Sequence, residues 1–172
     1  MPYPEAMVRP MREELTRLGV DELRDADAVD AAFEEAQDET MLLVINSVCG
    51  CAAGNARPAV NLVQNAEHQP DRYVTVFAGQ DLEATERARE YLPGIPPSSP
   101  FMALFQNGDP VFIVERKHIE GRSANAIAQD LVDAFAEYCG NGAGSNGEPE
   151  QPEAGDDSDA ADDLPSTFRS IM

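Results

Sequence analysis

Two cysteines separated by a single glycine stand in the segment NSVCGC, residues 46–51. The thiolate form of cysteine attacks disulfides, and the free N–H groups at a helix N-terminus stabilise that thiolate. Cys49 follows an apolar run over residues 41–45 and precedes a stretch with a helical pattern. We therefore expect Cys49 to be a nucleophile at a strand-to-helix junction, with Cys51 about one turn inside the helix and less exposed.

The spacing of the two thiols limits what they can do together. A disulfide between cysteines only one residue apart is strained, although Gly50 relaxes the backbone between them. Strained disulfides are easily reduced. The spacing therefore favours chemistry through a mixed disulfide on Cys49, or an oxidising, isomerase-like pair. The alternative is two structural thiols, since free cysteines are often buried in protein cores; a pair flanking a glycine at such a junction makes that alternative weak.

Periodic apolar residues predict the elements that position this motif. Helices are predicted over residues 5–18, 27–37, 50–66 and 82–91, and from Ser123 to about Tyr138. Strands are predicted over residues 41–45, 73–77, 101–105 and 111–114, with Asn107-Gly108 as the hairpin turn. Strands that alternate with helices favour right-handed crossovers and parallel neighbours, and the final hairpin adds an antiparallel edge. This order predicts a thioredoxin-like α/β fold: a mixed central sheet flanked by helices, with extra helices at the N-terminus.

Helix boundaries follow from capping residues. The first helix is expected to bury one face and stop at Gly19; the residues of that face are Met7, Met11, Leu15 and Leu18. Asp25 or Asp27 is expected to cap the second helix, Asp81 the helix that ends near Tyr91, and Ser123 the last one.

The thioredoxin-like layout gives meaning to two prolines. Pro58 lies nine residues after Cys49, where a proline inside the helix would kink it. Thioredoxin-like domains carry a cis proline directly before the strand that faces the nucleophile, so we predict that the Ser99–Pro100 bond is cis; the alternative is a trans proline that opens a strand. Arg57 could stabilise the Cys49 thiolate or bind an anionic thiol, or lie on the surface.

Four segments carry a resemblance to a known family: NSVCGCAAGNARPAV (46–60), TVFAGQD (75–81), PPSSPFMALF (96–105) and ERKHIEGR (115–122). In order and spacing they resemble the bacilliredoxin family over about residues 4–139. The resemblance implies a thiol-disulfide oxidoreductase that removes bacillithiol, a low-molecular-weight thiol, from S-thiolated cytosolic proteins. Cys49 would take the bacillithiol in a mixed disulfide, and a second bacillithiol or Cys51 would release it.

The same resemblance implies no bound cofactor, with bacillithiol as co-substrate, and a reductase of that thiol as a partner besides the S-thiolated proteins. The acidic segment after Cys139 is expected to lie outside the family pattern. The alternative functions are a general protein disulfide isomerase or reductase, and a thiolate metal carrier. The carrier is disfavoured because no CxxC or paired histidines complete a four-ligand site, so no metal ligand is predicted.

Other candidate residues are less informative. Cys139, at the end of the last helix, is interpreted as a half-buried structural thiol, with a third redox thiol or a dimer link as alternatives. His118 and Glu120 are interpreted as solvated loop residues. Asn46, Asp81 and Glu115 could relay protons, but no pattern selects them. The chain is expected to be a monomer or a homodimer.

Charge defines the classes of partner that can be excluded. The chain has 172 residues, with 32 acidic and 12 basic side chains and a net charge of −20, which disfavours nucleic acids and anionic membranes. Residues 140–172 hold eight acidic residues and Arg169, which leaves −13 on residues 1–139. We predict a domain over 1–139 and a disordered acidic tail over 140–172.

The N-terminus has no apolar segment typical of a secretory signal, and no apolar run approaches the roughly 20 residues that span a bilayer. Three cysteines make no disulfide framework. The sequence therefore predicts a cytoplasmic protein. The acidic excess, with eleven arginines and the single lysine Lys117, favours a cytoplasm of high salt.

Overall fold

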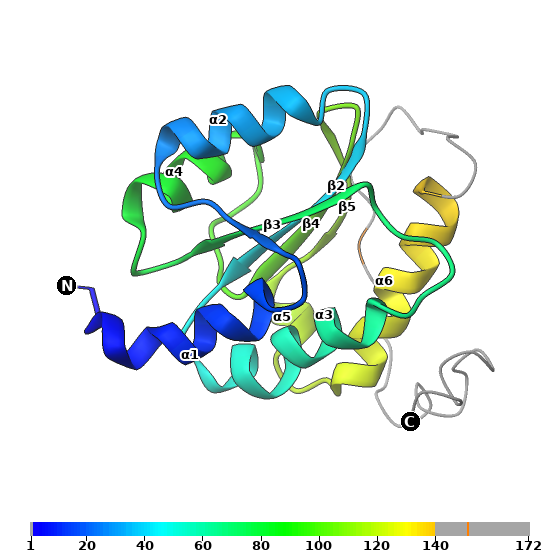
Figure 1. Cartoon of the computed structure of the whole chain (residues 1–172). Helices are drawn as coiled ribbons and strands as arrows, with labels where there is room; N and C mark the ends of the chain where they lie inside the picture. The colour runs from blue at the N-terminus through cyan, green and yellow to red at the C-terminus, as the bar shows by residue number, and fades with distance from the viewer. Residues whose placement is uncertain (1, 140–150, 152–172) are drawn as a thin grey trace.

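The computed structural model describes residues 2–139 and residue 151 and centres on a five-stranded mixed sheet (Figure 1). The strands are β1 (Asp21–Glu22), β2 (Thr40–Asn46), β3 (Arg72–Phe77), β4 (Phe101–Gln106) and β5 (Asp109–Val114). They lie in the order β1-β3-β2-β4-β5. The two-residue strand β1 was not predicted, because two polar residues carry no alternating pattern.

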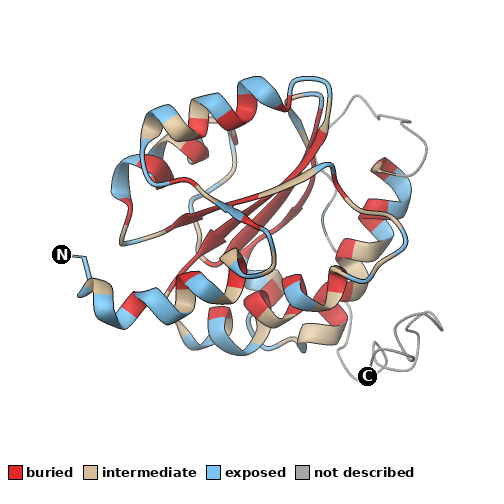
Figure 2. Cartoon of the chain, in the orientation of Figure 1, coloured by how far each residue is buried: buried red, intermediate tan, exposed pale blue. Residues whose placement is uncertain are grey.

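The central strand β2 is buried on both faces, as its unbroken apolar sequence predicts. Successive side chains of a strand point to opposite faces. Met41, Leu43 and Ile45 accordingly pack in one hydrophobic cluster, and Leu42 and Val44 pack in the other. Buried residues therefore fill the centre of the sheet, with β2 and β4 buried over their whole length, while the flanking helices mix buried and exposed residues (Figure 2).

Helices cover both faces of the sheet (Figure 1). They are α1 (Glu5–Thr16), α2 (Ala26–Glu35), a π-helical turn η1 (Ala52–Ala56), α3 (Arg57–Val63), α4 (Leu82–Glu90), α5 (Arg116–Ile119) and α6 (Ala124–Tyr138). The helices α2 and α4 cover one face, and α1, α3 and α6 cover the other. The short helix α5 lies in a segment interpreted from the sequence as a loop.

The first helix differs from its prediction in the face that it buries. Val8, Arg12 and Leu15 are its buried residues, whereas Met7 is 49% exposed. The reason is electrostatic: burial of Arg12 among carboxylates rotates the helix away from the expected all-apolar face. Gly19 follows the helix with a φ of +92°, in the left-handed region that glycine adopts at helix ends.

Two of the three predicted caps are confirmed. The Asp25 carboxylate accepts a hydrogen bond from Ala28 N at 2.8 Å, and the Ser123 hydroxyl accepts one from Ala126 N at 3.1 Å. Asp81 stands at the N-cap position of α4, but its side chain makes no capping hydrogen bond. Its carboxylate instead accepts hydrogen bonds from Arg12 at 2.6 and 3.1 Å.

Strand direction differs from the alternating pattern at one position. β2 pairs with β3 in parallel, as predicted, but β4 is antiparallel to β2 as well as to β5. After α4, residues 91–100 run back to the edge at which β3 ended. Ten residues extend up to about 33 Å, which is enough for this return, so β4 enters the sheet from the same edge and runs the opposite way.

The predicted acidic tail, residues 140–172, lies outside the described residues except for residue 151. Within the described part of the chain, no helix combines the length and the apolar composition required to cross a membrane.

Candidate active site

Three segments leave the sheet at one edge. β2 ends at Asn46, β4 begins at Phe101 opposite Ile45, and β5 ends at Val114 opposite Met102. The chain directly beyond these strand ends comprises residues 47–51, 98–100 and 115–119. The register of the sheet thus brings the cysteine segment, the predicted cis proline and the start of α5 to the same edge.

The Cys49 side chain lies between a serine hydroxyl and the start of a helix. The Ser47 hydroxyl donates a hydrogen bond to Cys49 Sγ at 3.3 Å, and it accepts one from Cys49 N at 3.3 Å. Helical backbone begins at Gly50, and Ala52 N donates to Cys49 O at 3.1 Å. The predicted strand-to-helix junction is confirmed, and it directs several donors toward the thiol.

The two thiols have opposite acidities. Partial burial opposes ionisation of Cys49, but hydrogen bonds from the Cys51 thiol, the Ser47 hydroxyl and two backbone N–H groups outweigh it and lower the pKa of Cys49. Burial, together with the hydrogen bond to Cys49 and the charge of Cys49, raises the pKa of Cys51. Cys49 therefore ionises first, and Cys51 keeps its proton and shares it with the Cys49 sulfur.

Both thiols are half-buried, and Cys51, the one expected to be less exposed, packs against the hydrophobic core. Gly50 and Cys51 form the first turn of the helix rather than its second. Gly50 is itself exposed, has no positive φ, and has no atom within 4 Å of an added Cβ. Nothing in this dithiol form of the protein requires glycine there.

Arg57 lies in the core beneath the cysteine segment, not on the surface. It is 3% exposed, and its Nη1 donates to Asn46 Oδ1 and to Ser47 O, each at 2.9 Å. Its Nε donates to the Glu14 carboxylate of α1. The guanidinium is therefore engaged by the scaffold, and its described contacts include neither thiol. Arg57 shapes the site by fixing the backbone of Ser47.

Asn46 completes this scaffold. Its Nδ2 donates to Met11 O at 3.2 Å, and its Oδ1 accepts from Ser47 N at 2.9 Å as well as from Arg57. A side chain with two donors and an acceptor can join a helix, a strand end and a loop in this way. The sequence offered Asn46 only as one of three residues that could relay protons; its position at the end of the buried strand is the signal that could have identified it as a positioning residue.

The helix is irregular near Pro58, where a kink was predicted, but the irregularity is a π turn. The helix does not simply bend at the proline: residues 52–56 form a π turn in which Arg57 N donates to Ala52 O, and α3 begins immediately afterwards. Pro58 has no N–H to donate, and the wider turn accommodates this missing donor. Such π turns often occur at functional sites.

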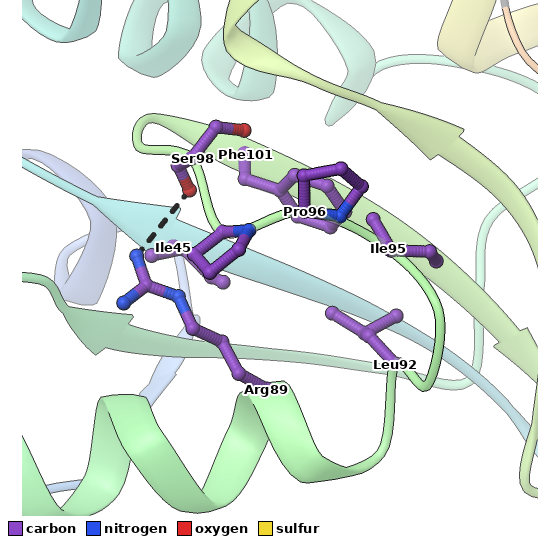
Figure 3. Close-up of a pocket in the computed structure, with 8 residues that line it drawn as sticks. Ile45, Arg89, Leu92, Ile95, Pro96, Ser98 and Phe101 are labelled. Carbon is purple, nitrogen blue, oxygen red and sulfur yellow. Dashed lines mark hydrogen bonds between the residues drawn. The ribbon is translucent and has the colours of Figure 1, made fainter.

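The Ser99–Pro100 peptide bond is cis, as predicted. Beside it lies a small apolar pocket, whose wall includes Ile45, Leu92, Ile95, Pro96 and Phe101 (Figure 3). The pocket leaves only about 10 Å³ for the centre of a water molecule, the minimum for one water. Arg89 reaches over it from α4 and donates to Ser98 O at 3.5 Å, so the pocket supports the proline segment rather than holding a ligand.

His118 and Glu115 form the start of α5. The Glu115 carboxylate accepts from His118 N, and His118 Nδ1 accepts from Glu115 N at 3.0 Å. Burial lowers the pKa of His118. The interpretation of His118 as a solvated loop residue is therefore wrong: His118 is a capping residue, and Glu120 directly follows the helix.

Cys139 lies far from the other two thiols. It contacts Thr40, the first residue of β2, whereas Cys49 follows the last residue of that strand. The seven residues of β2 separate these ends by about 20 Å. Burial raises the pKa of Cys139 to about 11. Cys139 is thus a half-buried thiol that packs at the edge of the hydrophobic core, and it cannot reach the Cys49 sulfur.

The described residues contain no group of three or more His, Cys, Asp or Glu side chains placed to hold one metal ion. Cys49 and Cys51 alone would supply two thiolates, short of the four ligands of a structural zinc site. The arrangement instead provides an ionisable sulfur, a proton donor beside it and a helix N-terminus.

Comparison with known proteins agrees with this chemistry. A solved structure described as having a thioredoxin fold matches with a TM-score of 0.51 and 13% identity, over 66% of this chain and 93% of that chain. The family model described as "Disulphide isomerase" matches residues 3–139. Fold and cysteine pair together define a thiol-disulfide oxidoreductase of the thioredoxin type.

Curated relatives specify the family. A bacilliredoxin of Salinibacter ruber is 67% identical over 172 residues, with 99% of each chain covered. Bacilliredoxins of Koribacter versatilis and Bacillus licheniformis are 50% and 49% identical, over 83% and 80% of this chain and 98% and 95% of their own lengths. The chain belongs to the bacilliredoxin family.

The segment after Cys139 was expected to lie outside the family pattern, and the family model does end at residue 139. The Salinibacter relative, however, aligns over nearly the full length of this chain. The C-terminal extension is therefore shared with at least one family member.

Proposed function

We propose that the protein removes bacillithiol from S-bacillithiolated proteins through a mixed disulfide on Cys49. The observation that carries this proposal is the asymmetry of the pair: the Cys49 sulfur accepts a hydrogen bond from Ser47 and has a lowered pKa, and Cys51 beside it has a raised pKa. A nucleophile with an adjacent proton donor is suited to accept one thiol and release another. Membership of the bacilliredoxin family supports the choice of thiol.

The exchange proceeds in two balanced steps. The Cys49 thiolate attacks the bacillithiol sulfur of the protein mixed disulfide; the S–S bond breaks, the target cysteine leaves as a thiolate, and Cys49 becomes disulfide-bonded to bacillithiol. A second bacillithiol thiolate then attacks this disulfide and leaves as bacillithiol disulfide, which frees Cys49. Alternatively Cys51 attacks Cys49 Sγ and expels bacillithiol, and the resulting internal disulfide takes two electrons from two bacillithiol molecules.

The experiment is an intact-mass measurement of the Cys51→Ala variant after incubation with a bacillithiolated carrier protein. We expect one bacillithiol per chain, lost on reduction, with the Cys49→Ala variant as the control that gains none. The proposal would be overturned if the Cys51→Ala variant formed no bacillithiol adduct. If the same variant instead trapped the carrier protein itself, general disulfide isomerase or reductase chemistry would be the better assignment, as the description of the matching family model suggests.

The cellular setting forms part of the proposal. S-thiolated cytosolic proteins are the substrates, the reductase of the low-molecular-weight thiol is the partner that restores it, and the cytoplasm is the location. The acidic surface is proposed as an adaptation to high salt, because dense carboxylates keep a surface hydrated when salt screens their repulsion. Retention of folding and activity at molar salt tests this last point.

A further inference from the structure

The short helix α5 lies between the cysteine-bearing helix and the cis-proline segment. On one side, Asn55 of η1 donates to Ile119 O at 3.4 Å and to Arg122 O. On the other side, Arg116 N donates to Ser98 Oγ and Arg116 Nη1 donates to Ser99 O, both at 3.3 Å. Arg116 is thereby held at the edge of the sheet from which both thiols project.

Positive charge in this region is concentrated on α5 and the turn that follows it. Residues 47–56, which include both thiols, contain no charged side chain, whereas residues 115–122 hold three of the twelve basic residues of the chain. Arg122 is ion-paired with Asp130 at 2.6 Å, and Lys117 is 69% exposed and faces Glu115 at 3.5 Å. Arg116 differs from both because it also contacts the cis-proline segment.

The ion pair of Arg116 is weak enough for a ligand to displace. Its Nε lies 3.6 Å from the Glu120 carboxylate, and the two side chains are 45% and 64% exposed. Exposed pairs of this kind contribute little stability, because solvent and salt screen the two charges. A planar guanidinium anchored on one side to a backbone carbonyl keeps its remaining N–H donors for a carboxylate.

We propose that Arg116 binds a carboxylate of the low-molecular-weight thiol while that thiol is disulfide-bonded to Cys49. The inference rests on the proposed function and names the residue that gives it selectivity for an anionic thiol such as bacillithiol. Arg116 is a specificity-determining residue here: the thiol exchange itself needs only the sulfurs, and Arg116 places the non-reacting end of the ligand.

Two other arginines near the site are unsuited to this role, and a third competes with Arg116 for it. Arg57, one of whose possible roles from the sequence was to bind an anionic thiol, is buried and bonded to Glu14, Asn46 and Ser47. Arg89 lies over a pocket that holds one water at most. Arg17 lines a larger hollow of about 170 Å³, between α1 and the helix that follows the cysteines, and it is the competing candidate that the experiment must separate.

The experiment compares two substrates of the full chain: one carrier protein disulfide-bonded to bacillithiol, and the same carrier bonded to uncharged 2-mercaptoethanol. For Arg116→Met we expect the ratio of kcat/KM for the anionic over the neutral adduct to fall about tenfold, mainly through KM. Arg116→Lys should keep part of the ratio, and Lys117→Met, the matched control on the same helix, should keep it all. Added salt should lower the wild-type ratio toward that of Arg116→Met.

The assignment would be overturned if Arg116→Met left the ratio of kcat/KM for the anionic over the neutral adduct unchanged. It would also be overturned if Arg17→Met, and not Arg116→Met, lowered that ratio. Should Arg116→Met fold poorly, Glu120→Gln gives an independent test, since removal of the competing carboxylate should raise the ratio. These outcomes are distinct from failure of the proposed function, in which Cys51→Ala would form no bacillithiol adduct on Cys49 with Arg116 intact.

Discussion

The Ser47 hydroxyl donates a hydrogen bond to the Cys49 sulfur over 3.3 Å and accepts one from the Cys49 N–H over the same distance. One hydroxyl therefore fixes the backbone of the nucleophile and stabilises its ionised sulfur. The hydroxyl is itself placed by Arg57 and Asn46, which bind the Ser47 backbone from below. Reactivity of the thiol thus depends on a buried polar scaffold as well as on the helix N-terminus.

Replacement of Ser47 by alanine removes the donor to the thiolate and should raise the pKa of Cys49. Below that pKa, the rate of iodoacetamide alkylation should fall about 2- to 10-fold, the range for a hydrogen bond of about 0.5–1.5 kcal/mol. The pH dependence of thiolate absorbance measures the pKa directly. Ser47→Thr keeps the hydroxyl and should remain close to the wild type; an equal effect of both variants would contradict the role of the hydroxyl.

Cys51 is expected to tune Cys49 as well as to resolve its disulfides. Loss of the Cys51 thiol in Cys51→Ala should raise the pKa of Cys49, because the thiol donates to the thiolate. Cys51→Ser restores a donor and should return the pKa of Cys49 toward its lowered value. The pH dependence of thiolate absorbance in the two variants measures the pKa of Cys49, which should be higher in Cys51→Ala than in Cys51→Ser. Identical titrations of the two variants would contradict a contribution of the Cys51 donor to the lowered pKa of Cys49.

Arg57 is expected to contribute to the stability of the whole domain. Arg57→Met removes a donor from Ser47 O and from Asn46 Oδ1, of which Asn46 Oδ1 keeps its hydrogen bond from Ser47 N. A buried group left unsatisfied costs about 1–3 kcal/mol, so we expect a loss of about 1–3 kcal/mol in the free energy of unfolding, measured in urea. Arg9→Met on the exposed face of α1 is the control and should stay within about 0.5 kcal/mol. A loss no larger than the control's would show that the scaffold is not needed for folding.

The sequence predicted the parts of the site that depend on local pattern. An unbroken apolar run before Cys49 indicates a buried strand, and the thiols after it must then lie at the sheet edge. The Ser99–Pro100 bond was predictable only through the thioredoxin-like resemblance. Arg57 was not predictable as a buried residue, since its partners Glu14 and Asn46 are distant in sequence and its charge argues for the surface.

The remaining differences have similar tertiary causes. Arg12 takes a core position in α1 because Asp81 and Glu22 meet it from other elements. That ion pair also withdraws the Asp81 side chain from its capping role. The four-residue helix α5 is too short for a periodic signal, so the position of Arg116 became evident only from its contact with Ser99.

Cys139 is expected to be unreactive near neutral pH. Its pKa of about 11 leaves little thiolate there, so iodoacetamide at pH 7.5 should label Cys49 well before Cys139, as peptide mapping by mass spectrometry would show. Because the pKa is raised, the folded protein keeps the Cys139 proton at pH values between about 8.5, the ordinary pKa of a thiol, and about 11. The unfolded chain loses the proton in this range. The stability from this group is present below 8.5 and lost as pH rises toward 11. Cys139→Ala should reduce that alkaline loss, and faster labelling of Cys139 than of Cys49 would contradict the assignment.

Gly50 is expected to matter only when the two thiols are joined. In the dithiol form its backbone is helical, its surroundings are open and φ is not positive. Gly50→Ala should therefore raise the free energy of unfolding by up to about 1 kcal/mol, because alanine loses less backbone entropy than glycine. Closure of the Cys49–Cys51 disulfide needs the flexibility that alanine removes. Its reduction potential should rise by about 20 mV, which corresponds to about 1 kcal/mol for two electrons.

Redox titration against glutathione, followed by the mass of the alkylated chain, measures this potential. Gly54→Ala is the matched control, because Gly54 is also exposed and free of neighbours within 4 Å but lies outside the pair. It should leave the potential unchanged. If Gly50→Ala left the potential equally unchanged, the glycine would not relieve strain in the internal disulfide, and release of the thiol by Cys51 would no longer depend on this residue.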